Sequence, residues 1–182
     1  MEIEVTQEKL AKALSSVSRV AAGARATLPI LSNVLIRADD NKVSLTATNL
    51  DMAVVEYVPV VSAKNGAITV PARLLAEFIS NLPRGEKIII KAEGAKVKIS
   101  AGKYTSTVNG MAADDFPELP EIDEDNAVKY QLGIDEFKAG ISEVVIAVST
   151  DTTRPVFTGV CFNTFEGDLY IAATDGYRLG EK

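Results

Sequence analysis

The stretch Val5-Thr6-Gln7-Glu8-Lys9-Leu10, followed by Leu14 and Val17, sets the pattern of this chain because it recurs twice. The later copies are Val70-Pro71-Ala72-Arg73-Leu74-Leu75, followed by Ile79 and Leu82, and Leu132-Gly133-Ile134-Asp135-Glu136-Phe137, followed by Ile141 and Val144. Each copy has an apolar residue at its first position and again five, nine and twelve residues later. The last three of these positions fall on one face of a helix. The repetition predicts several copies of one structural unit.

Alternating strands flank each predicted helix. Leading strands are predicted over residues 3–5, 68–70 and 128–132. After the helices, strands are predicted over 30–36, 43–47 and 53–55, over 87–91, 97–100 and 104–108, and over 156–163 and 169–173. The clusters Asp39-Asp40-Asn41, Glu93-Gly94 and Glu166-Gly167-Asp168 are typical of hairpin turns. The sequence therefore predicts an α+β fold of strand–helix–three-strand repeats with antiparallel sheets.

The first and third repeats are the most similar pair. Pro29-Ile30-Leu31-Ser32-Asn33 aligns with Pro155-Val156-Phe157-Thr158-Gly159, and Leu45-Thr46-Ala47-Thr48-Asn49 aligns with Ile171-Ala172-Ala173-Thr174-Asp175, both at a spacing of 126 residues. The larger repeat is therefore a domain of two units. We predict a first domain over residues 1–121, an acidic linker over 122–127 and the first half of a second domain over 128–182. A half-domain leaves sheet edges open, so we expect the chain to be a fragment of a longer protein.

The charge of the chain is concentrated in one segment. Seven acidic residues and no basic residue lie between positions 114 and 125, whereas the whole chain has a net charge of −6. The remaining residues are thus close to neutral, and long-range attraction to nucleic acid should be weak. Local basic residues could still contact phosphates.

The composition limits the possible chemistry. The chain has no histidine and a single cysteine, Cys161, which excludes Ser-His-Asp catalysis and the common zinc sites. We expect no catalytic residue, no cofactor and no metal site, and we expect Cys161 to be buried in a strand. A lone cysteine and the lack of a secretory signal or membrane-length apolar run favour a cytoplasmic protein.

Five segments together carry a family resemblance. They are Thr27-Leu28-Pro29-Ile30-Leu31, Leu45-Thr46-Ala47-Thr48-Asn49-Leu50-Asp51, Val70-Pro71-Ala72-Arg73, Asp115-Phe116-Pro117 and Ala173-Thr174-Asp175-Gly176-Tyr177-Arg178-Leu179. In order and spacing they resemble the bacterial replicative sliding clamp, the beta subunit of DNA polymerase III. The resemblance implies a DNA-clamp fold with sheets outside and helices on the inner face of a ring-shaped homodimer. It also implies a non-catalytic processivity factor that encircles double-stranded DNA. Polymerase III, the clamp loader and repair proteins would bind it through a linear peptide.

The resemblance also implies site residues. DNA contacts would come from loop and helix residues, namely Arg25, Arg73, Asp151, Thr152 and Arg154, with Asp151 an unfavourable neighbour for phosphate. Part of a peptide pocket would come from Phe157, Thr174, Gly176, Tyr177, Arg178 and Leu179. The dimer edge would include Lys103, Thr105, Ser106 and Val108, with Ser106 where a bulky aromatic residue is common.

The sequence also allows simpler explanations for some of these residues and other functions for the chain. Arg154 could equally form a structural salt bridge, and Tyr177 and Leu179 could belong to a strand core. The whole chain could instead be a scaffold that binds only proteins. A magnesium-dependent carboxylate enzyme using Asp51 and Asp175 is also possible, although an Asp-Gly pair at a strand end is most often a turn.

Overall fold

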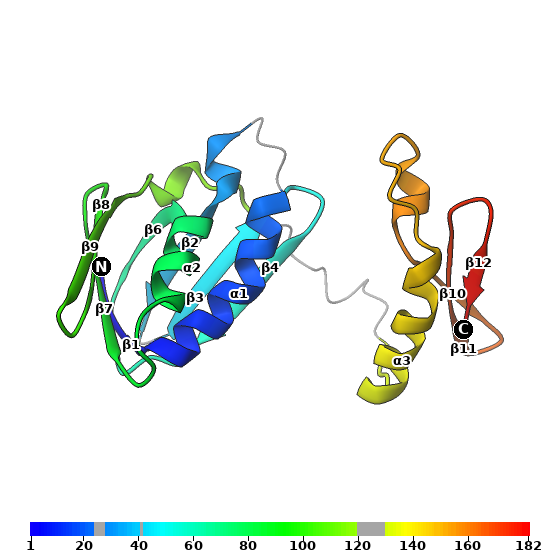
Figure 1. The fold of residues 1–182 in the computed structure, drawn as a ribbon, viewed down its shortest axis with the longest axis horizontal. Coiled ribbons are helices and arrows are strands. Elements are labelled where there is room, and N and C mark those ends of the chain that lie inside the picture. Colours follow the sequence, from blue (N-terminus) through cyan, green and yellow to red (C-terminus); the bar gives the residue numbers. More distant parts are fainter. Residues whose placement is uncertain (24–27, 41, 120–129) are drawn as a thin grey trace. The chain divides into compact units, whose positions relative to one another are not determined.

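The computed structural model describes residues 1–23, 28–40, 42–119 and 130–182. The chain forms two compact units, Met1–Glu121 (unit 1) and Ile122–Lys182 (unit 2). Figure 1 shows the elements of each unit. The predicted linker over 122–127 and the predicted contact residue Arg25 lie outside the described residues.

The described residues of unit 1 form two antiparallel sheets and two α-helices. In chain order its elements are β1 (Glu2–Thr6), α1 (Gln7–Gly23), η1 (Pro29–Ser32), β2 (Asn33–Asp39), β3 (Lys42–Thr48), β4 (Ala53–Val58), β5 (Ser62–Lys64), β6 (Gly66–Pro71), α2 (Ala72–Ser80), β7 (Lys87–Glu93), β8 (Lys96–Ala101), β9 (Tyr104–Asn109) and η2 (Ala113–Asp115). One sheet has the order β5-β1-β7-β8-β9, and the other has the order β4-β3-β2-β6. The observed fold agrees with the predicted α+β class.

The two repeats of unit 1 exchange their leading strands. Strand β1 of the first repeat pairs antiparallel with β7 of the second, with Glu4 opposite Ile89. Strand β6 of the second repeat pairs antiparallel with β2 of the first, with Leu35 opposite Thr69. Each repeat thus completes the sheet of the other, so neither sheet of unit 1 is built from one repeat alone.

One large hydrophobic core joins the helices to both sheets of unit 1. Helices α1 and α2 lie side by side on one face of the strands (Figure 1). The periodic positions Val5, Leu10, Leu14 and Val17 are all fully buried. Complete burial of each such side chain contributes about 1.5–3 kcal/mol, so the repeated apolar positions hold this unit together.

In unit 2, residues 130–182 are described, and they form one α-helix and a three-stranded sheet. Its elements are α3 (Ile134–Val144), η3 (Val145–Ala147), η4 (Pro155–Thr158), β10 (Cys161–Phe165), β11 (Asp168–Thr174) and β12 (Leu179–Glu181). The strands are ordered β10-β11-β12. A small core of Val144, Ala147, Ile171 and Ala173 connects the helix to the sheet.

Two predicted strands begin later than the sequence pattern indicated, at Asn33 and Cys161, and a third, predicted over 128–132, lies partly outside the described residues. Residues 29–32 and 155–158 form 3₁₀ turns instead of the first part of a strand. Proline explains both corrections, because its fixed φ and missing N–H suit the first position of a helical turn. The third leading strand is wrong over 130–132, where no strand forms. Its counterpart β1 is held by β5 and β7, and residues 130–132 have no such partner strand among the described residues.

Candidate functional site

The turn between β11 and β12 is held by its own side chains. Thr174 Oγ1 donates to the Arg178 carbonyl at 2.6 Å and accepts the Gly176 N–H at 3.0 Å. Asp175 Oδ1 accepts the N–H groups of Tyr177 and Arg178 at 2.9 and 3.0 Å. Gly176 has φ +93°, a conformation that glycine adopts without steric cost. The side chains of Thr174 and Asp175 and the positive φ of Gly176 thus have structural roles in this turn, whereas the Tyr177 side chain is 95% exposed.

The charge of Asp175 is stabilised by the same turn. Asp175 Oδ2 lies 3.0 Å from Arg178 Nε. The N–H groups of Tyr177 and Arg178, followed by the Arg178 charge, hold the pKa of Asp175 below its usual value. Asp175 is thus an ionised turn residue, and its oxygens already have partners.

A hollow of about 390 Å³ adjoins the turn. It is lined by Val156, Phe157, Gly159, Val160, Cys161, Ala172, Ala173, Thr174 and Leu179. Phe157, Thr174 and Leu179 from the predicted pocket thus come together here. Gly176, Tyr177 and Arg178 belong to the adjoining turn but do not line the hollow. The lining is mostly apolar and can bury an apolar side chain of a ligand.

Several lining residues were missed because the sequence placed them in a strand core. Cys161 in particular was expected to be buried, and the structure shows it exposed. All five residues of β10 are exposed. Strand alternation distinguishes the two faces of a sheet but does not tell whether another layer covers either face. The apolar run around Val160 and Cys161 was the available signal, and it has the same appearance in a pocket and in a core.

The loop before η4 contains the second group of predicted contact residues. Asp151 Oδ1 accepts the hydroxyl and the N–H of Thr153 at 2.6 and 2.9 Å. Asp151 Oδ2 lies 3.5 Å from Arg154 Nε, and the Arg154 guanidinium lies 5.0 Å from the Phe157 ring centroid. Thr153, with a smaller effect of Arg154, lowers the pKa of Asp151. Arg154 therefore forms the structural ion pair that the sequence left open. Its contact with Phe157 links the loop to the hollow. Thr152 is exposed.

The remaining predicted residues lie in unit 1. Arg73 projects from α2 and forms an ion pair with Glu77, with Nε and Oε1 2.8 Å apart.

Strand β9 is an outer strand of its sheet, and it carries an exposed Thr105 and a half-buried Ser106. The unpaired side of such a strand can accept another strand. The predicted edge residues also include Lys103, an exposed turn residue just before β9, and Val108, which is in the core of unit 1.

Other kinds of site have little support in the described parts of the chain. There, no group of three or more His, Cys, Asp or Glu side chains is placed to hold a metal ion. No helix among the described residues is long and apolar enough to cross a membrane. The site that does emerge is an apolar hollow beside an ordered turn.

Paired strand–helix repeats with antiparallel sheets define a clamp-fold protein. The family model for the N-terminal domain of the DNA polymerase III beta subunit matches residues 1–120, and that for its central domain matches residues 131–182. The chain therefore belongs to the DNA polymerase III beta subunit family.

Relatives and solved structures agree with this assignment. The beta sliding clamps of Synechococcus elongatus and Bacillus subtilis are 35% and 32% identical to this chain over 98% of its length. The chain spans about half the length of these relatives, 48% and 49%. A Bacillus subtilis sliding clamp structure matches with a TM-score of 0.90 and 30% identity, covering 100% of this chain and 49% of that one. A Bartonella birtlesii sliding clamp bound to griselimycin matches with a TM-score of 0.86 and 35% identity, covering 100% and 49%.

Proposed function

We propose that the protein acts as a DNA sliding clamp, a non-catalytic processivity factor that encircles duplex DNA and tethers the replicative polymerase. The observation that carries this proposal is the match of consecutive clamp-family models to unit 1 and unit 2. By the same reasoning, residues 1–121 would be the first clamp domain and 128–182 the first half of the second. Such a protein would work in the bacterial cytoplasm, where the chromosome is copied.

The hollow of unit 2 would receive a linear peptide from polymerase III, the clamp loader or repair proteins. Its apolar lining supports this role, because a buried leucine or phenylalanine would displace water from Phe157 and Leu179. Exposed Tyr177 would close over the peptide, and the ordered turn around Gly176 and Arg178 would reduce the entropy lost on binding.

DNA contacts would be weak and independent of sequence, as sliding requires. Arg25 and Arg73 are the best candidates. Arg73 would exchange Glu77 for a phosphate at little cost, because their ion pair is exposed. Arg154 and Thr152 would contribute less, because Asp151 beside them repels phosphate.

Strand β9, with Thr105 and Ser106, would pair with the neighbouring subunit of a homodimeric ring.

Primer extension tests the tethering function. The protein that carries this chain, its loader and polymerase III are placed on a primed single-stranded circle, with excess competitor primer to limit each polymerase to one binding event. We expect long products with the protein and short ones without it. Leu179→Asp should restore short products, because a carboxylate in an apolar hollow opposes peptide burial. Val61→Asp, at an exposed position in unit 1, is the matched control. Short products with the unaltered protein would contradict the proposal.

A further inference from the structure

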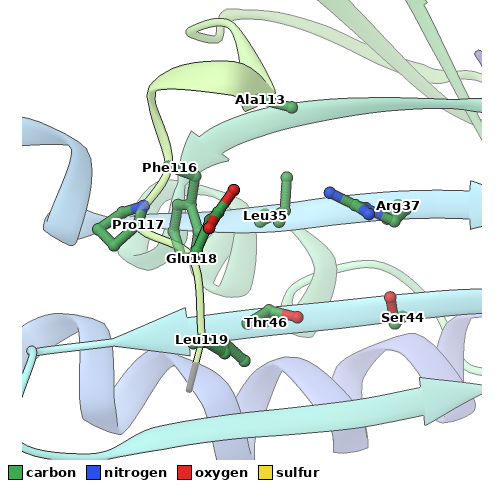
Figure 2. A pocket seen from close by; sticks show the side chains of 9 residues that line it. All are labelled: Leu35, Arg37, Ser44, Thr46, Ala113, Phe116, Pro117, Glu118 and Leu119. Carbon is green, nitrogen blue, oxygen red and sulfur yellow. The ribbon is translucent and has the colours of Figure 1, made fainter. Parts of the chain in front are cut away.

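A second groove lies in unit 1, on the sheet that contains β2 and β3 (Figure 2). Its volume is about 640 Å³. The floor is formed by two cross-strand pairs, Leu35 with Thr46 and Arg37 with Ser44. The chain segment that follows η2 crosses these strands and forms a wall. Phe116 of this segment is buried in a cluster with Leu35, so the wall is anchored to the floor.

The groove occupies the same sheet positions as a groove in unit 2. At the spacing of 126 residues, the two floor pairs correspond to Cys161 with Ala172 and Asn163 with Tyr170. These four residues line a groove of about 340 Å³. Cys161 and Ala172 also line the candidate peptide hollow. The groove in unit 1 is therefore the counterpart of the surface that carries the candidate peptide site.

The neighbouring turns show that this correspondence extends to individual hydrogen bonds. Thr48 Oγ1 donates to the Met52 carbonyl at 2.9 Å and accepts the Leu50 N–H at 3.1 Å. Asn49 Oδ1 accepts the N–H groups of Asp51 and Met52 at 3.1 and 2.8 Å. Leu50 has φ +77°, as Gly176 has φ +93° in the turn of unit 2. The two turns, one beside each groove, therefore have the same hydrogen-bond pattern.

The charge of the groove indicates what it would bind. Arg37 is exposed, and no carboxylate pairs with it among the residues that the structure describes. Leu35 and Arg37 are alternate residues on one face of β2, which places them about 7 Å apart. An extended peptide has the same spacing between alternate side chains. An acidic residue of the peptide could thus pair with Arg37 while an apolar residue two positions away lies above Leu35 against the wall, where Pro117 and Leu119 are only half-buried.

We propose that this groove of unit 1 is a second docking site, for a short extended peptide with an apolar residue and an acidic residue two positions apart. Glu118 on the wall is the charged group that opposes such a peptide. The site therefore has one residue that should strengthen binding and one that should weaken it.

The probe is the capped peptide Ala-Leu-Ser-Asp-Ala, added to the ¹⁵N-labelled 182-residue chain at low salt and followed by NMR. We expect the amide signals of Leu35, Arg37, Ser44 and Thr46 to shift, and the same peptide with Asn in place of Asp to bind more weakly. Arg37→Gln should raise the Kd about threefold, and Glu118→Gln should lower it about twofold, as expected for exposed charge pairs. Both residues are exposed, so neither change should affect folding.

The experiment separates this site from the hollow of unit 2. Lys98→Gln is the matched control, because it also removes one exposed positive charge from unit 1 but lies outside the groove, and it should leave the Kd unchanged. Shifts confined to residues 156–179, absence of any shift, or an Arg37→Gln variant with unchanged Kd would overturn the proposal. Failure of the unit 2 hollow to bind a peptide would leave the proposed site in unit 1 unaffected.

Discussion

Asp175 and Asn49 occupy equivalent turns and accept equivalent pairs of backbone N–H groups. Only the first can lose its charge, so the two turns should respond differently to acid. The folded-state pKa of Asp175 is lowered from an unfolded value near 3.9. Its carboxylate therefore stabilises the turn fully above that value, and this stabilisation is lost as the pH falls through the lower folded-state pKa.

We predict that the amide signals of Tyr177 and Arg178 titrate as the pH is lowered below about 4, whereas Asn49, which accepts the Met52 N–H, has no proton to gain. An NMR pH series measures both turns in one sample. Asp175→Asn, which copies the turn of unit 1, should abolish the titration while the hydrogen bonds remain. Persistence of the titration at Tyr177 and Arg178 in the Asp175→Asn variant would show that Asp175 is not responsible.

A second prediction concerns Gly176. Its φ of +93° is costly for any residue with a Cβ, so Gly176→Ala should destabilise unit 2 by about 1–2 kcal/mol. Urea denaturation followed by NMR signals of unit 2 gives this value. Gly159→Ala is the control, because Gly159 has φ −121° and an added Cβ meets nothing within 4 Å. Equal effects of the two changes would refute the backbone explanation.

At the scale of the elements, the sequence predicted α1 and α2 well. The repeated positions Val70, Leu75 and Ile79 are fully buried, and Leu82 is only 6% exposed. The same pattern was less accurate for α3. Val144 is fully buried, but Leu132 and Phe137 are 46% and 38% exposed. Periodicity predicts the apolar face of a helix, whereas burial also needs a neighbouring layer, which α1 and α2 provide for each other.

Adjacent leucines of α2 test this packing. Leu75→Ala should destabilise unit 1 by about 3 kcal/mol, because Leu75 is fully buried and its loss leaves a cavity. Leu74→Ala should cost less than about 1 kcal/mol, because Leu74 is 49% exposed. Urea denaturation followed by far-UV circular dichroism compares them. Similar losses for both variants would mean that the periodic face does not determine stability.

At the scale of the whole chain, the sequence revealed the repeats but not how they pair. No local signal indicated that β1 would join β7 and β6 would join β2, because strand exchange depends on residues far apart in the chain. The pocket was only partly predictable for a related reason. Phe157, Thr174 and Leu179 were identified through family resemblance, whereas Cys161 and Ala172 join them because two strands pair in a particular register.

A clamp of the proposed kind would hold DNA by encircling it, so its retention would depend on topology and not on charge. The most direct measurement is retention on DNA of different topology. The protein that carries this chain is loaded on a nicked circular plasmid, washed in high salt, and measured again after a single cut linearises the plasmid. Salt weakens phosphate contacts steeply but does not open a closed ring. We predict that the complex survives the high-salt wash on circular DNA and is lost from linear DNA. Loss in high salt from both forms alike would contradict encirclement.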